Sequence, residues 1–200
     1  KLERQPAGTA LSGLLRLTNG TIGSLVRDAT DKATATGQAS GLLTFAGRGL
    51  SPRAIVASLT GSGSIDTGAI RFSSLTPATI RAAANDVLKA DAEPMFERLQ
   101  ETLKSQSGAN AMTMTPRRIA VEFADGLLKL APVTIESADG KIAADAHLDL
   151  QSLRVQSTWR IETTAKIEGR SGKAADPLPA VTLAYAGPVA ALGRIESRIT

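Results

Sequence analysis

The sequence predicts an α+β fold in which a curved antiparallel β-sheet, arranged as a meander, has a short helix and a helical hairpin packed on it or beside it. Apolar and polar residues alternate with a period of two between Arg117 and Thr163, which is typical of strands with one buried face. Asp-Gly pairs at 125–126 and 139–140 interrupt the alternation where hairpin turns belong. Apolar residues recur at helical spacing in residues 77 to 105. With 42% apolar and 21% charged residues, the 200-residue chain has the composition of a soluble globular domain.

The first 36 residues are expected to be a poorly defined N-terminal segment. Leucines indicate a short apolar stretch at 11–17, Asn-Gly at 19–20 is a turn signal, and residues 22–26 suit a helical turn. The pattern becomes regular at Gly37, where alternation predicts a strand that ends near residues 47–49.

A short helix is expected directly after this strand. Ser51 is a natural N-cap residue, and Pro52 suits the first helical position. The helix ends before Gly61, and residues 61–72 follow as two short glycine-containing strands. The expected buried stripe of this short helix consists of Ile55, Val56 and Leu59.

Residues 77–105 are expected to form a helical hairpin. Thr-Pro at 76–77 repeats the cap chemistry of Ser-Pro at 51–52. Pro94 divides the region, because proline lacks the backbone donor and clashes with the preceding turn of a helix. A third Thr-Pro pair, at 115–116, precedes a strand, so we interpret the similarity as shared turn chemistry rather than a repeat.

The regular alternation predicts four consecutive antiparallel strands, at 117–124, 127–136, 141–149 and 153–163. A polar connection at 166–177, a strand at 180–185 and a Gly-Pro turn at 187–188 follow. We therefore expect residues 37–200 to be one β-rich domain with a helical insertion at 77–105, and the chain to be a fragment of a longer protein.

Residues that commonly carry chemistry are scarce. The chain has no cysteine, which excludes disulfides, thiolate nucleophiles and cysteine-ligated metals. His147 is the only histidine, so sites that need two imidazoles are excluded, and it falls on the polar face of a predicted strand. Neither a phosphate-binding glycine motif nor a G-x-S-x-G nucleophile elbow is present. We therefore expect no enzyme activity, no cofactor and no metal.

Nucleic-acid binding is not expected either. Aromatic residues make up 3% of the chain, too few for a base-stacking platform. The net charge of +4 is scattered, and Arg117-Arg118 is the only adjacent basic pair.

The apolar face of the predicted sheet is the remaining candidate site, and it has two interpretations. An open face would hold lipid acyl chains, because burying methylene groups is favourable and needs no polar specificity group. A face fully covered by residues 77–105 would instead be the core of a structural or protein-binding module. The candidate lipid-facing residues are Ile119, Val121, Phe123, Ile142, Ala144, Leu148, Val155 and Trp159.

Three stretches resemble the C-terminal domain of the AsmA-like family of Gram-negative bacteria. Residues 49–64, from Gly-Leu-Ser-Pro to Leu-Thr-Gly-Ser-Gly-Ser, resemble the family's small helix followed by an L-x-G-x-G passage. Residues 124–150, with Asp-Gly-Leu-Leu-Lys-Leu near the start and Asp-Leu at the end, resemble its paired strands. Residues 179–188, with Tyr-Ala-Gly-Pro at the end, resemble its closing strand.

The resemblance implies a periplasmic module on the periplasmic side of the inner membrane, held there by an N-terminal anchor outside this chain. It implies a role in outer-membrane biogenesis and in phospholipid homeostasis or transport through an apolar β-groove. The expected partners are phospholipid acyl chains and other envelope proteins. The family offers no catalytic residues to transfer to this sequence.

Overall fold

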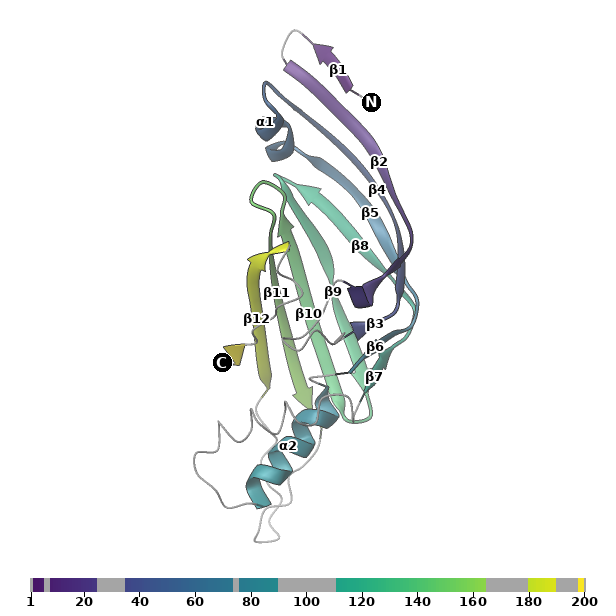
Figure 1. Ribbon diagram of the computed structural model, residues 1–200, viewed down its shortest axis with the longest axis vertical. Helices are drawn as coiled ribbons and strands as arrows, with labels where there is room; N and C mark the ends of the chain where they lie inside the picture. The colour runs from purple at the N-terminus through teal and green to yellow at the C-terminus, as the bar shows by residue number, and fades with distance from the viewer. Residues whose placement is uncertain are drawn as a thin grey trace.

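The computed structural model describes residues 2–5, 8–24, 35–73, 76–89, 111–164, 180–189 and 198–199. Most of these residues belong to antiparallel strands, and two α-helices accompany them (Figure 1). The larger sheet is open, with the strand order β1-β2-β4-β5-β8-β9-β10-β11-β12-β13. Its strands are β1 (Leu2–Gln5), β2 (Gly8–Thr21), β4 (Gln38–Gly49), β5 (Thr60–Thr67), β8 (Arg117–Ala124), β9 (Leu127–Ser137), β10 (Gly140–Asp149), β11 (Arg154–Thr163), β12 (Val181–Pro188) and β13 (Arg198–Ile199).

A second, three-stranded sheet has the order β3-β6-β7. The helices lie near opposite ends of the larger sheet, α1 at the upper end and α2 at the lower end of Figure 1. These elements are β3 (Ala35–Thr36), β6 (Ile70–Phe72), β7 (Met112–Met114), α1 (Pro52–Ala57), α2 (Pro77–Lys89) and the 3-10 helix η1 (Ile22–Ser24).

The predicted meander is confirmed, because β8, β9, β10 and β11 are consecutive neighbours in the sheet. Asp125 and Gly126 both have positive φ, as a two-residue hairpin turn of the primed type requires. The second hairpin differs by one residue from the prediction. Gly140 already pairs with Ser137, so Ala138 and Asp139 form its turn.

The N-terminal segment contains the longest strand of the larger sheet, which the sequence pattern did not indicate. Strand β2 has 14 residues and pairs with β4. Asn19 and Gly20 therefore lie in a strand and not in a turn, at a register irregularity where Asn19 has a φ of 50°. The expected helical turn is a 3-10 helix as far as Ser24, and residues 25 and 26 lie outside the described part of the chain.

Two further expectations near the ends of elements need correction. The stripe Ile55, Val56 and Leu59 is only half-buried, because α1 has six residues and covers little surface. Gly187 and Pro188 do not form a turn. They pair with Val155 and Arg154 as the last residues of β12.

Of the region expected to be a helical hairpin, α2 is helical, whereas residues 90–105, which include Pro94, lie outside the described residues. The polar connection at 166–177 also lies outside them.

Pairing between β8 and β9 is short. It runs from Val121–Leu130 to Ala124–Leu127, which is four pairs. Beyond it, β9 carries an extra residue between Leu130 and Val133, at the position of Pro132, whose lack of an N–H suits a site without ladder pairing. Arg117 reaches across this unpaired stretch, and its Nη1 donates to the Thr134 carbonyl at 2.7 Å.

The hydrophobic core lies between the larger sheet and the elements that cover its lower end. Ile135, Ile142 and Ile161 come from β9, β10 and β11 and are at most 3% exposed. They cluster with Ile80 and Ala83 of α2 and with residues of the smaller sheet, namely Ala35, Ile70, Met112 and Met114. The two sheets and α2 therefore share one core.

Replacing Thr76 with valine should lower the free energy of unfolding by about 1–2 kcal/mol. Thr76 is 1% exposed, and its Oγ1 accepts from the Thr79 N–H at 3.2 Å and lies 3.0 Å from the Thr79 hydroxyl. The valine variant keeps the side-chain shape and removes the cap of α2. Urea unfolding measures the loss. Ser51→Ala is the control, because it removes the exposed cap of the six-residue α1 and should cost less.

Candidate functional site

Cross-strand register shows which side chains share a face of the larger sheet, because directly paired residues point to the same side. Phe123, Leu128, Leu148 and Val155 form one row across β8, β9, β10 and β11. Three further rows on that side pair Val121 with Leu130 and Ala146, Ala144 with Trp159, and Ile142 with Ile161. We call this side the apolar face and the opposite side the polar face.

All eight candidate lipid-facing residues lie on the apolar face. Ile119 also belongs there, since it alternates with Val121 and pairs with Ile65 of β5. Their exposure differs. Val121, Phe123 and Ile142 are buried, at 2%, 7% and 3% exposure. The half-buried ones are Ile119, Ala144, Leu148, Val155 and Trp159.

The lower end of the apolar face is covered by protein. Ile142 belongs to the core cluster under α2 and the smaller sheet, and Trp159 packs against that cluster. The Trp159 ring meets Phe72 of β6 edge to face, with ring centroids 6.2 Å apart and planes at 67°. Ile142 is therefore part of the protein core, and Trp159 packs against it.

At the upper end, α1 packs against the same face. Gly47 pairs with Leu11 and is two residues from Phe45, and a Cβ atom at Gly47 would lie 2.8 Å from the carbonyl oxygen of Ile55. A glycine is needed there because any side chain would meet the backbone of α1. A Cβ atom at Gly49 would likewise lie 2.7 Å from Ala54.

Between these ends lies a half-buried aliphatic stretch, which we call the middle stretch. It consists of Leu43, Leu128, Leu130, Ala146, Leu148 and Val155. The tilted ring pair of Phe45 and Phe123, with centroids 6.3 Å apart, borders it. In β12, Tyr185 lies beside it, and its hydroxyl donates to the Pro188 carbonyl at 3.2 Å.

The sequence interpretation missed part of this surface. Leu43 and Phe45 alternate in β4, but their position beside β8 depends on β5 pairing between the two strands. Leu128 and Leu130 were missed because the extra residue in β9 shifts which residues of that strand point to the apolar face. The alternation in β4 was the one available signal.

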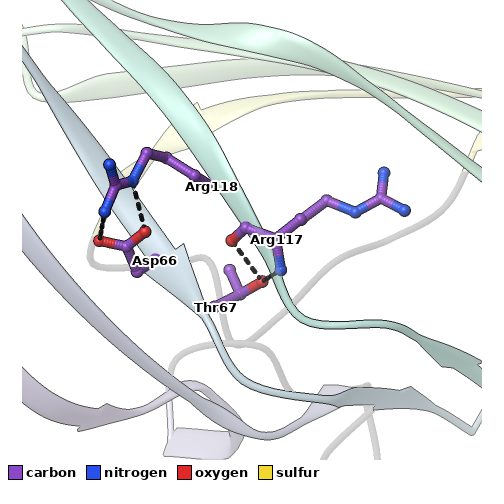
Figure 2. Close-up of polar contacts among 4 residues, drawn as sticks. All are labelled: Asp66, Thr67, Arg117 and Arg118. Carbon is purple, nitrogen blue, oxygen red and sulfur yellow. Dashed lines mark hydrogen bonds and ion pairs between the residues drawn. The ribbon is translucent and has the colours of Figure 1, made fainter.

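The polar face carries ion pairs between neighbouring strands. Figure 2 shows Arg118 and Asp66, on neighbouring strands β8 and β5, joined by two hydrogen bonds of 2.6 and 3.2 Å. The hydrogen bond to Asp66 and the charge of that carboxylate raise the pKa of Arg118. The preceding residue, Arg117, alternates to the opposite side. Its backbone N–H donates to the Thr67 hydroxyl, and that hydroxyl donates to the Arg117 carbonyl (Figure 2).

A second group of charges links β10 and β11. Glu162 lies 3.0 Å from Lys141 Nζ and 2.8 Å from Arg160 Nε. The hydrogen bond from Lys141, followed by that from Arg160, lowers the pKa of the Glu162 carboxyl. His147 is on this face too, where it pairs with Lys129 and Gln156. The described residues contain no group of three or more His, Cys, Asp or Glu side chains arranged to hold a metal ion.

A small pocket lies at the start of α2. Its volume is about 200 Å³, below the roughly 300–1,000 Å³ of ordinary small-molecule sites. Asp139 in its wall is already paired with Arg81. The middle stretch of the apolar face is therefore the stronger candidate site.

Comparisons with family models, with curated proteins and with solved structures give no match for this chain. Within the described part of the chain, neither helix has the length and apolar character to span a membrane.

Proposed function

We propose that the chain is a non-enzymatic periplasmic module that binds phospholipid acyl chains on the middle stretch of its apolar face, in the service of outer-membrane biogenesis and phospholipid homeostasis or transport. The half-burial of the middle stretch, between the two covered ends of the apolar face, supports this proposal most directly. In the proposal the sheet curves around the bound chain, and residues 77–105 form a helical hairpin beside it. The resemblance of three stretches to AsmA-like proteins supports the same assignment.

The chemistry of the middle stretch suits a hydrocarbon ligand. Leu43, Leu130 and Leu148 present only carbon atoms, and each methylene that they remove from water contributes about 0.8 kcal/mol. Ala146 is small, and it pairs with Leu130 in the row that also holds Val121. Binding would then depend on burial and not on a directional polar contact.

The covered lower end favours a second candidate, a structural or protein-binding envelope module without a lipid ligand. The side chains of Ile142 and Trp159 already pack against other residues of the protein. If the remaining face is equally covered in solution, the middle stretch is simply the edge of the core. The two functions differ in whether lipid accompanies the purified protein.

Native mass spectrometry of protein purified without detergent tests the proposal. We expect the unchanged chain to carry bound phospholipid, detected by its added mass. Leu148→Glu should carry at least tenfold less of that lipid, because burying a carboxylate against acyl chains in the middle stretch is unfavourable. His147→Glu is the matched control: the neighbouring residue of the same strand receives the same charge on the polar face, and lipid should remain.

A second variant guards against loss of the fold. Ala146→Phe fills the middle stretch without adding charge, and a thermal melt by circular dichroism shows whether each variant is folded. Folded variants that bind as much lipid as the unchanged chain would contradict the proposed site. Absence of lipid from the unchanged chain would favour the structural or protein-binding module.

A further inference from the structure

The outer edge of β2 is only partly occupied. Strand β1 pairs with residues 8–11 of β2 in an antiparallel register. Gln5 faces Gly8 at one end of this pairing, and Leu2 faces Leu11 at the other. Among the described strands, none pairs with the outer side of residues 13–19. An open strand edge presents a row of backbone donors and acceptors, which is the template for pairing with another strand.

Exposed leucines flank this edge on both faces of the sheet. Leu15 and Leu17 pair with Leu43 and Gly41 on the apolar face and are 56% and 49% exposed. On the polar face, Leu14 is 58% exposed, and Leu42, on the adjacent strand, is 41% exposed. Leucines that are exposed on both sides of one edge are what the addition of a strand would cover.

Protective features are sparse at this edge. Exposed edges usually carry several charges, proline or very short strands. Strand β2 has 14 residues, a single charged residue, Arg16, and no proline. The opposite side of the sheet differs, since β12 ends at Pro188 and β13 covers Leu183 and Ala184.

We propose that the outer edge of β2 at residues 13–19 accepts one further β-strand, antiparallel to β2 and in line with β1. Continuation of the β1 register sets its direction and its facing residues. The occupant is an extended polypeptide with apolar side chains opposite Leu14, Leu15 and Leu17, and with an acidic side chain opposite Arg16. Backbone hydrogen bonds hold such a strand, while its side chains set the specificity. This surface does not depend on the binding of lipid.

An in-line extension tests the inference. Ten residues are placed directly before Lys1. Continuation of the register brings the second, third and fifth positions back from Lys1 opposite Leu14, Leu15 and Leu17, and these positions are Val. The fourth position back, opposite Arg16, is Glu, and the remaining positions are Thr. Because the strand is tethered, its effective concentration is in the millimolar range. Amide hydrogen exchange is then measured by NMR across residues 13–17.

We expect alternate amides in residues 13–17 to exchange at least tenfold more slowly than in a chain with a Gly-Ser extension of equal length. Replacing the Glu of the extension with Lys should reduce that protection. Equal exchange with the Thr-Val and Gly-Ser extensions would overturn the inference. A dimer of the unextended chain that Leu15→Lys dissociates would also overturn the inference, because the occupant would then be a second copy. Leu50→Lys is the control for that measurement, since Leu50 is 88% exposed away from this edge and its replacement should leave such a dimer intact.

Discussion

Replacing Ile142 with alanine is expected to lower the free energy of unfolding by about 3 kcal/mol. Ile142 lies between Ile135 and Ile161 on the neighbouring strands, and all three are at most 3% exposed. Removing three carbon atoms leaves a cavity where the larger sheet meets α2 and the smaller sheet, and a close-packed site of this kind can collapse only in part.

Urea unfolding followed by circular dichroism measures this loss, provided that the dependence on urea concentration is unchanged. Leu153→Ala is the control, because Leu153 is 58% exposed in the turn between β10 and β11 and should cost under about 0.5 kcal/mol. A loss at Ile142 as small as that at Leu153 would show that the cluster is not the core of the protein.

Replacing Gly63 with valine is expected to have a similar effect, a loss of about 3 kcal/mol, through overcrowding instead of a cavity. A Cβ atom at Gly63 would lie 2.1 Å from the Leu42 carbonyl oxygen and 2.6 Å from Leu43 Cδ2. The first of these atoms belongs to the backbone of β4, so the side chain cannot be accommodated without separating β4 from β5.

The matched control is Ser62→Val, at the adjacent and exposed position of the same strand. Valine suits an exposed strand position, so this change should be neutral or slightly stabilising. Thermal unfolding of the two variants makes the comparison direct. Equal midpoints for Gly63→Val and Ser62→Val would show that β4 and β5 leave room for a side chain at position 63.

The meander was predictable because two independent signals agree there. One face of β8, β10 and β11 is mostly apolar with a period of two, and Asp125-Gly126 supplies the positive φ values of the first hairpin. A one-residue change of register would turn every side chain to the other face, so the pattern fixes the face as well as the strands. This is why all eight candidate residues could be placed on one side of the sheet.

Strand β2 was not predictable by the same means. Its Leu-Leu-Arg-Leu segment at 14–17 has no period of two, because leucines are exposed on both faces of this edge strand. Alternation arises only where one face is buried and the other is solvated. The extra residue in β9 is a comparable case, since a bulge changes the parity of the pattern that the prediction relies on.

The sequence also could not show which part of the apolar face is covered. The covering elements come from separate places in the chain: Ala35, Ile70, Ile80 and Met112 meet over β9, β10 and β11. Strands of two or three residues carry too little periodic signal to be recognised, and their docking depends on contacts between distant segments. The burial of Ile142 beside the half-burial of Leu148 follows from that docking.

The brief pairing of β8 with β9 makes this junction the weakest seam in the interior of the larger sheet. Four residue pairs join the two strands there, against seven between β5 and β8 and nine between β9 and β10. Opening the sheet between its N-terminal and C-terminal halves therefore breaks the fewest backbone hydrogen bonds at this point. Motions that change the angle between the two halves of the sheet should therefore concentrate between β8 and β9. The hydrogen bond from Arg117 to the Thr134 carbonyl joins the two strands there and should restrain such motions.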